Sequence, residues 1–196
     1  MTSSLQGALL SQPCDRSWLA ELRGKYRYRP LCSEDTGLVV KFYGLLDAYS
    51  LYYRFLGIFK DFEGHAKRLF SNKCNYAIGA FDHGGDMVGL GEGFSDCTDA
   101  ELAFAVTPPH RGKGIATVLA SLLILEAYRR GMKTMEAYMH AENMPAVRIG
   151  QRLGLNLCLE EGGVYHGKAE VARIRDLALR AIEEKGGRLL TGYLSF

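Results

Sequence analysis

The stretch VTPPHRGKGIATVLASLLILEAYRRG, from Val106 to Gly131, says the most about how this chain folds. It joins the end of an apolar, strand-like run to two prolines, two basic residues and two glycines, and then to a long helical pattern. The helical periodicity holds from Ile115 to Arg130, and Gly131 is placed to end the helix. A glycine-rich, basic turn before a helix suits phosphate, because backbone N–H groups and the helix N-terminus then point at one spot.

Two well-known phosphate-binding loops do not match this stretch. A Walker loop needs a glycine five residues before the Gly112-Lys113 pair, and that position is Thr107. A dinucleotide-binding loop needs a third glycine after Gly112 and Gly114, and that position is Thr117. The Walker loop is therefore excluded, and the dinucleotide loop keeps only two of its three glycines.

A third arrangement fits better. Arg111, Gly114 and Ala116 lie directly after a predicted strand and directly before the long helix. In such a loop the main chain holds a pyrophosphate, and Arg111 and Lys113 add positive charge. The alternative is a basic, glycine-rich turn that binds nothing, and the loop alone leaves both interpretations open.

Length and composition bound the class of protein. The chain has 196 residues, 47% of them hydrophobic, which is enough for one domain with a core. A formal net charge of +2 gives no general attraction for nucleic acid, so any anion site is local. No apolar run approaches the length of a membrane span, and no signal segment is recognisable at the N-terminus. We therefore expect a cytoplasmic protein with no membrane partner.

The cysteines are odd in number and widely spaced. They lack a Cys-x-x-Cys pair and nearby paired histidines. Such spacing favours reduced thiols over a disulfide framework or a metal site. The five are Cys14, Cys32, Cys74, Cys97 and Cys158.

The patterns along the chain predict one α/β (α+β) domain with a mixed, mostly antiparallel sheet flanked by helices. Residues 1–24 predict an arm or a short helix around Trp18–Arg23, residues 25–175 the domain, and residues 176–196 a C-terminal helix and tail. Strands are predicted at 25–31, 74–81, 87–94, 100–106, 133–139, 155–160 and within 161–171. Helices are predicted at 36–46, 50–59, 115–130, 144–153 and 174–187. The strands between Asn75 and Val106 predict an antiparallel meander.

Residues 100–155 resemble the GNAT superfamily of acetyl-CoA-dependent N-acetyltransferases. The signatures that carry the resemblance are Arg111, Gly114 and Ala116 in the first, and Asn143, Ala146 and RLGL in the second. The segments RPLCSED and SLYYRFLG are similar to the opening of the Pat-type protein lysine acetyltransferases, and the resemblance covers about Tyr26 to Glu160. Pat-type enzymes often carry a fused regulatory domain, for which this chain has no room. Regulation is therefore expected from the arm, the C-terminal helix or self-association, with a homodimer left open.

The resemblance implies a GNAT fold in which the fourth and fifth strands splay apart, with acetyl-CoA as cosubstrate. Its pantetheine arm would pair with the fourth strand like an added β-strand. The implied cofactor contacts are Phe104, Ala105 and Val106 for pantetheine, Arg111, Gly112, Lys113, Gly114, Ile115 and Ala116 for the phosphates, and Asn143 for the cofactor arm.

Acetyl transfer to an amine needs a base, because a lysine amine with a pKa of about 10.4 is protonated at neutral pH. Glu101 is the first candidate. It is the only charge in the strand AELAFAV, and the Pat-type enzymes use an acidic residue at the matching position as general base. The alternative is that Glu101 simply points into solvent. Glu92, on the preceding strand, is the second candidate, although its flanking glycines also suit a bulge or close packing.

The general acid has no assigned residue. Many GNAT members carry a tyrosine in the helix after the asparagine, where this chain has Ile149 and Gly150, and Pat-type members also tend to lack it. Tyr138 and Tyr165 are within reach of the expected site, but the sequence favours an ordinary amphipathic role between surface and core for each. Water alone would also serve as the acid.

The leading hypothesis is a direct-attack N-acetyltransferase whose acceptor is a protein lysine. A small amine, such as a polyamine, amino acid or drug, is the second acceptor class. A non-catalytic acyl-CoA-binding module is the alternative from another functional class, because it needs the phosphate loop and no base.

Overall fold

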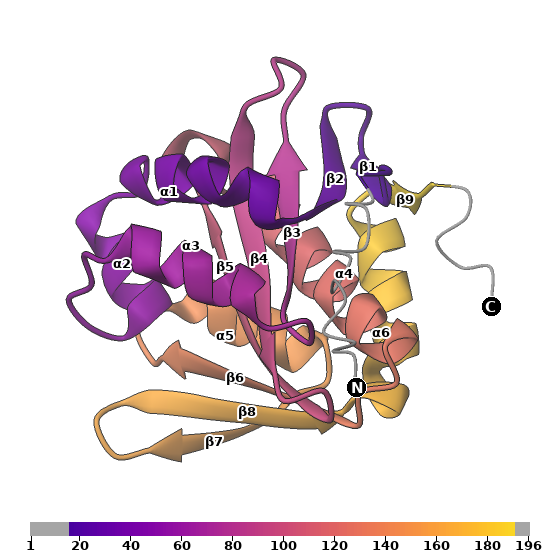
Figure 1. Ribbon diagram of the computed structural model, residues 1–196. Coiled ribbons are helices and arrows are strands. Elements are labelled where there is room, and N and C mark those ends of the chain that lie inside the picture. The colour runs from indigo at the N-terminus through magenta and orange to yellow at the C-terminus, as the bar shows by residue number, and fades with distance from the viewer. Residues whose placement is uncertain (1–15, 191–196) are drawn as a thin grey trace, which may run out of the picture.

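The computed structural model describes residues 16–190, and these build one nine-stranded sheet with helices on both faces (Figure 1). The strands are β1 Ala20–Leu22, β2 Tyr26–Leu31, β3 Tyr76–Phe81, β4 Met87–Ser95, β5 Asp99–Val106, β6 Thr134–His140, β7 Asn156–Glu160, β8 Val164–Glu170 and β9 Gly187–Leu189. The α-helices are α1 Thr36–Gly44, α2 Ala48–Phe55, α3 Phe62–Ser71, α4 Ile115–Arg129, α5 Met144–Arg152 and α6 Val171–Glu184. Short 3₁₀ turns cover Ser33–Asp35 and Pro108–His110.

The strand order is β7-β8-β6-β5-β4-β3-β2-β1-β9. All neighbouring pairs are antiparallel except β5 and β6, which are parallel. The predicted mixed, mostly antiparallel sheet and the β3-β4-β5 meander are therefore confirmed. Counted from β2, the first strand that the sequence predicted, β5 and β6 are the fourth and fifth strands.

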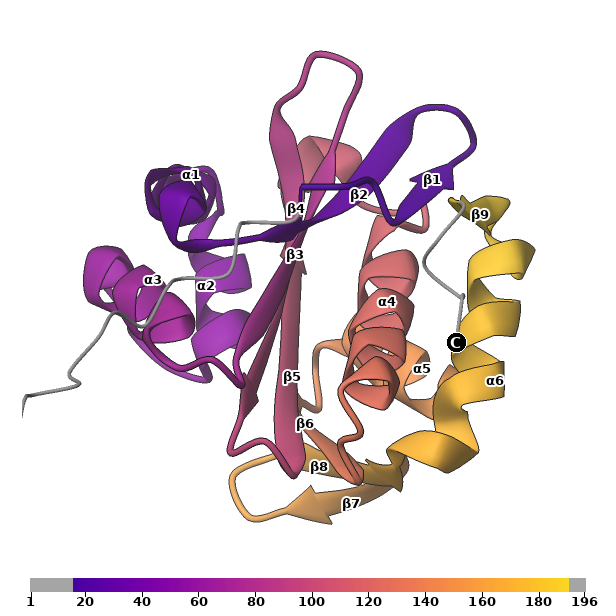
Figure 2. The same ribbon diagram turned by 45° about the vertical axis from the view of Figure 1, so that its right-hand side comes forward.

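Two hydrophobic cores hold the sheet between the helices. Figure 2 shows α1, α2 and α3 on one face of β3–β5 and α4 and α6 on the other. Helix α4 is buried almost all round, from Ile115 to Ala127, because the sheet, α5 and α6 surround it. Helix α6 buries one face, including Ile174 and Ala178, in that same core. Helix α6, the last helix of the described residues, is thus part of the central packing.

Two predictions near the chain ends are corrected by the structure. Residues 20–22 form strand β1 between β2 and β9, and not the short helix expected around Trp18–Arg23. The strand expected to be the last one, β8, is followed by α6 and then by β9. A three-residue strand carries too little pattern to be recognised, because its stability comes from its partners. The remainder of the predicted arm and the last six residues lie outside the described part of the chain.

Helix α3 was not predicted, although it had local signals. Asp61 caps it by accepting a hydrogen bond from the Gly64 N–H at 2.9 Å. Its buried residues Ala66 and Leu69 face the core that α1 also covers. Conversely, α2 stops at Phe55 and not at residue 59, because Leu56 takes a left-handed conformation with φ of 51°.

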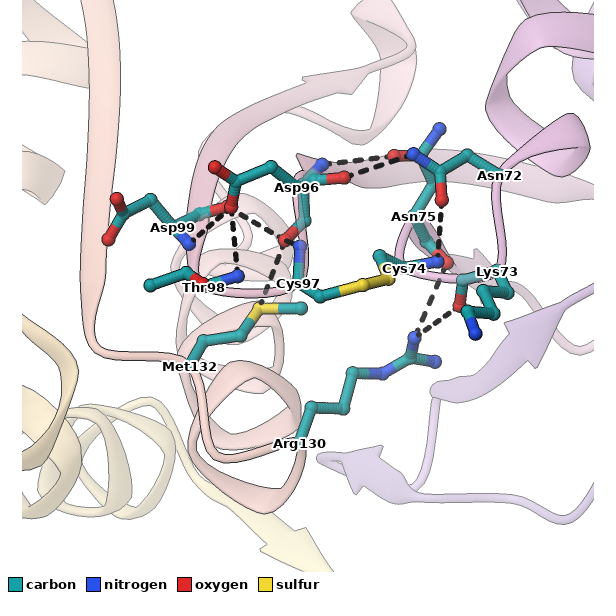
Figure 3. Close-up of a disulfide and its surroundings, with 11 residues drawn as sticks. Asn72, Lys73, Cys74, Asn75, Asp96, Cys97, Thr98, Asp99, Arg130 and Met132 are labelled. Carbon is teal, nitrogen blue, oxygen red and sulfur yellow. Dashed lines mark hydrogen bonds between the residues drawn. A yellow bond between two sulfur atoms is a disulfide. The ribbon is translucent and has the colours of Figure 1, made fainter.

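Cys74 and Cys97 form a disulfide, so the expectation of reduced thiols throughout is wrong (Figure 3). The bond joins the segment after α3 to the turn between β4 and β5. The antiparallel pairing of Tyr76 with Gly93 brings these two turns to the same end of the sheet. Sequence spacing gave no sign of this, because the proximity arises only when β3 and β4 pair. Cys158 is a free, exposed thiol on β7.

Candidate active site

The loop between β5 and α4 opens onto a cleft of about 640 Å³. Gly112 and Gly114 have φ values of 74° and 92°, in the left-handed region that side chains other than glycine rarely adopt. Gly114 forms the N-cap of α4, so the turn directs the first N–H groups of the helix into the cleft. This geometry explains why glycines occur on both sides of Lys113.

Nine of the ten residues predicted to bind the cofactor line this one cleft. They are Phe104, Ala105, Val106, Arg111, Gly112, Gly114, Ile115, Ala116 and Asn143. Lys113 is the exception, because its Nζ donates to the carbonyl oxygen of Pro109 at 2.8 Å. Asn143 also caps α5, with its Oδ1 accepting a hydrogen bond from the Ala146 N–H at 3.4 Å.

Cations from separate segments meet at the cleft. Arg111 comes from the loop, Arg148 from α5 and Lys185 from the C-terminal end of α6. Lys185 and Arg148 were not predicted, and Lys185 lies in the helix that falls outside the resemblance. Three convergent positive charges beside free helix N–H groups fit a polyphosphate.

Arg111 also ties the loop to helix α2. Its Nη2 donates to Asp47 Oδ2 at 2.7 Å and to the hydroxyl of Ser50, and its Nε donates to the Val106 carbonyl at 3.2 Å. Asp47 caps α2 by accepting from the Ser50 N–H, and this bond together with Arg111 lowers the pKa of Asp47. The phosphate-side loop and the start of α2 are therefore mechanically linked.

The parallel strands β5 and β6 pair for only three rungs. Pairing ends at Glu101 opposite Glu136, and beyond that point the strands diverge, as Figure 1 shows. A second, narrower cavity of about 50 Å³ lies in the gap. Leu102 and Phe104 of β5 and Tyr138 of β6 line it, and α5 closes it with Ile149. The unpaired edge of β5 past Glu101 has free main-chain groups for an extended ligand.

Glu101 lies at the last paired rung before this gap. It stands opposite Phe94, whose side chain packs on the α1–α3 side of the sheet, so Glu101 is on that side too. Its side chain is exposed. Across the rung, Glu136 accepts hydrogen bonds from Lys168 at 2.5 Å and pairs with His166 at 3.0 Å.

Of the two tyrosines considered from the sequence, Tyr138 lies on the same face of the sheet as Glu101. Slight burial and the carboxylates of Glu136, Glu160 and Glu101 raise the pKa of Tyr138. Its ring stacks on His166 with centroids 4.6 Å apart, and it is 38% exposed. Tyr165 instead packs against the core on the α4 side.

Glu92 lies in a buried polar cluster with its exposed fraction at 0%. It accepts from the Tyr43 hydroxyl at 2.6 Å and from Arg54 Nε at 3.1 Å, and it pairs with His65 Nε2 at 2.9 Å. Burial alone would raise the pKa of Glu92, but attraction to Arg54 and the bonds from His65 and Tyr43 lower it to about 2.

The glycines beside Glu92 reflect close packing, one of the two alternatives the sequence left open. A Cβ on Gly93 would lie 2.3 Å from the Tyr76 ring, and one on Gly91 would lie 3.0 Å from Leu123 of α4. Sequence reasoning missed Tyr43, Arg54 and His65 as partners of Glu92. The sequence did carry one indication of these partners, namely the carboxylate of Glu92 within an apolar strand. A buried carboxylate requires hydrogen-bond donors, so partners of this kind were to be expected.

Within residues 16–190 no helix is long and apolar enough to cross a membrane. Over the same range, no three histidine, cysteine, aspartate or glutamate side chains come together as a metal-binding group.

Comparison with known proteins places these features in context. The model of the acetyltransferase (GNAT) family matches residues 42–155. The GNAT domain of S. lividans PAT is similar in structure, with a TM-score of 0.65 and 22% identity over 74% of this chain and 90% of that one. Spermidine N-acetyltransferase from Vibrio cholerae, solved with CoA and spermine, has a TM-score of 0.62 and 17% identity over 78% of this chain and 99% of that one. A GNAT-family acetyltransferase from Bacillus anthracis has a TM-score of 0.58 and 17% identity over 80% and 99%.

Proposed function

Because this chain belongs to the GNAT acetyltransferase family, we propose that it moves the acetyl group of acetyl-CoA directly to a primary amine, with Glu101 as the general base. The observation that carries the proposal is the place of Glu101. It stands at the rung where β5 and β6 part, next to the gap that leads from the cationic cleft. A thioester carried along the edge of β5 would end beside this carboxylate.

The chemistry of the acceptor explains why a carboxylate belongs there. An amine with a pKa of about 10.4 arrives as an ammonium ion, which Glu101 attracts and then deprotonates directly or through a water. The nitrogen lone pair attacks the carbonyl carbon, and the C–S bond breaks to release the CoA thiolate. Tyr138, on the same face, is the tyrosine placed to return a proton to that thiolate.

Glu92 is the weaker candidate for the base. A carboxylate with a pKa of about 2 is a poor proton acceptor at neutral pH, and its oxygens are occupied by Tyr43, His65 and Arg54. These contacts support Glu101 as the residue that removes the proton.

A protein lysine is the acceptor we propose. Glu101 and Tyr138 are both exposed, which supports an acceptor side chain that is presented by another protein. The similarity to the GNAT domain of S. lividans PAT agrees with this choice. A polyamine is the second candidate, favoured by the carboxylate of Glu101 and by those of Glu136 and Glu160 near Tyr138. Glu136 and Glu160 already pair with Lys168 or His166, so Glu101 is the carboxylate that a polycation would meet first.

The variant Glu101→Gln tests the proposal. It should reduce acetylation by about 100-fold or more, because the amine then stays protonated, and calorimetry should show nearly unchanged CoA affinity. Rates are measured with lysine peptides and with spermidine, and the better acceptor identifies the class.

The matched control for the lysine-peptide assay is Glu160→Gln, which removes a nearby charge on β7, away from the splay, and should leave that rate nearly unchanged. Unchanged acetylation by Glu101→Gln would remove Glu101 from the mechanism. Absence of any acetyl-CoA consumption by the unmodified protein across both acceptor panels would instead support a non-catalytic acyl-CoA-binding module.

A further inference from the structure

Arg54 is a buried cation at the meeting point of the two cavities. It lies in the last turn of α2, and its side chain is only 8% exposed. It lines the cationic cleft together with Val106 and Arg111, and it also lines the narrower cavity between β5 and β6. The side chain therefore stands where the phosphate end of the site leads into the splay.

Glu92 holds the guanidinium in place. Arg54 donates to Glu92 Oε2 through Nε at 3.1 Å and also through Nη2. Glu92 is opposite Ala103 on β5, two residues beyond Glu101 on the same face of the sheet. The fork of Arg54 thus lies over the part of β5 where the strand edge first becomes free.

Residues outside helix α2 bind side chains at both of its ends. Arg111 binds Asp47 and Ser50 at the start of the helix, and Glu92 binds Arg54 at its end. Because these bonds hold the Arg54 guanidinium in place, it needs little reorganisation when negative charge develops beside it. Transition-state stabilisation requires a donor that is fixed in this way.

The charge balance of the pair suits a cationic acceptor. The negative charge of Glu92 offsets the positive charge of Arg54, so the pair does not repel an incoming ammonium ion. The bonds to Glu92 use Nε and Nη2, and Arg54 also shares a side-chain hydrogen bond with Tyr43. Nη1 is the nitrogen that Glu92 does not engage. Because the Arg54 side chain is buried, a hydrogen bond from it is worth more than the same bond in solution.

We propose that Arg54, through Nη1, donates a hydrogen bond to the carbonyl oxygen of the bound acetyl thioester and stabilises the negative charge that this oxygen gains on attack. This inference rests on the proposed function. When the amine nitrogen, already deprotonated once by Glu101, bonds to the carbonyl carbon, the C=O π pair moves onto the oxygen beside Arg54. The second proton that the nitrogen loses balances the proton that Tyr138 gives to the thiolate. The pair then returns, the C–S bond breaks, and the thiolate leaves with the electrons of that bond. Glu92 acts as a positioning residue for Arg54.

The test combines a spectroscopic and a kinetic measurement. The double variant Arg54→Met with Glu92→Gln removes both buried charges together, so neither is left unpaired. With acetyl-CoA labelled with carbon-13 at the carbonyl, the infrared carbonyl band of the bound thioester should lie at lower frequency in the unmodified protein than in the variant. The kcat should fall by about 100- to 1,000-fold, with CoA affinity kept within about threefold.

Two companion variants keep the outcome decisive. Arg54→Lys retains a cation beside Glu92 without the fork, so it should fold and show the same loss of the band shift. Glu92→Gln should lower kcat while keeping the acidic limb of the pH–rate profile, which Glu101→Gln should abolish. A Glu92 that acted as base would lose that limb.

An identical carbonyl band in the unmodified protein and in either Arg54 variant would overturn the inference, as would a kcat within threefold of the original. If the unmodified protein transfers acetyl groups and the band does not move, only the role of Arg54 is refuted. If the unmodified protein binds no acetyl-CoA, the proposed function and this inference fall together.

Discussion

Gly114 is the residue on which the shape of the loop between β5 and α4 most depends. Its φ of 92° is a conformation that costs other residues about 1–3 kcal/mol, and an added Cβ would lie 3.4 Å from the side chain of Lys185. Gly114 therefore needs a left-handed backbone conformation and also packs against Lys185, one of the cations of the cleft. No other loop residue meets both conditions, since the space beside Gly112 is open.

Gly114→Asp should weaken CoA binding by at least about 100-fold, or roughly 2.7 kcal/mol. The new carboxylate would occupy the place of a phosphate oxygen and would pair with Lys185. Calorimetry with CoA measures the effect. Gly131→Asp is the control, because Gly131 has a similar φ of 73°, open space around it, and a position at the far end of the same helix. Normal CoA affinity in Gly114→Asp would contradict the phosphate-cradle interpretation.

At the scale of elements, the disulfide links the segment before β3 to the turn after β4. Cys74 and Cys97 are 23 residues apart, and β3 and β4 make up most of the segment between them. Side chains reinforce the same junction, since Ser95 donates its N–H to Asn75 at 2.9 Å and Asn72 donates to the Ser95 carbonyl at 3.1 Å (Figure 3). The junction holds the base of the meander that carries Glu92 and Glu101.

Removal of this bond should destabilise the protein and leave the site chemistry in place. For a loop of this length a disulfide contributes about 3 kcal/mol, and its loss should lower Tm by roughly 10 °C. The variant Cys74→Ser with Cys97→Ser is compared by calorimetry with Cys158→Ser, which removes an exposed free thiol and should not change Tm. Equal melting temperatures in all three proteins would show that the bond adds no stability.

At the scale of the whole molecule, buried carboxylates make the fold sensitive to acid. Asp35 is buried and binds Arg29 through two hydrogen bonds of 2.9 Å each, while the Cys32 N–H donates to it at 3.2 Å. Burial alone would raise the pKa of Asp35, but these partners lower it. Glu92 follows the same pattern, with a pKa of about 2.

The sign of the pH dependence follows from these shifts. An aspartate in the unfolded chain has a pKa of about 3.9, so the lowered pKa in the folded state adds stability that is complete above this value. This stability is lost as the pH falls through the folded-state pKa. We expect the free energy of unfolding to decrease steeply below about pH 4, as measured by urea unfolding.

Asp35→Asn isolates one contribution. It should cost about 3 kcal/mol at pH 7, and the difference from the unmodified protein should shrink toward pH 2 because the native Asp35 is then protonated too. Asp176→Asn, at an exposed position on α6, is the control with little effect at either pH. A difference that stays constant from pH 7 to pH 2 would show that the charge of Asp35 is not the cause.

Much of the fold could be predicted from the sequence because residues close together in the chain specify it. The meander from Asn75 to Val106, the helix that begins at Ile115 and the glycines of the loop each have their own periodicity or backbone requirement. Helix α3 was also readable in principle from its Asp61 cap. Strands β1 and β9 were not, because three residues such as Ala20–Leu22 become a strand only when β2 offers a partner.

The sequence by itself determined which residue types are present and in what order, and so the phosphate loop, the lone carboxylate of AELAFAV and the family. Tertiary structure decided what those residues meet. In the folded protein, Glu101 lies at the rung where β5 and β6 part. Arg54 binds Glu92, 38 positions away in the sequence, and Lys185, at the end of α6, lies beside Gly114. The physical reason is that strand pairing and burial act between segments far apart in the chain. A local pattern specifies an element, but only the packed sheet specifies its neighbours.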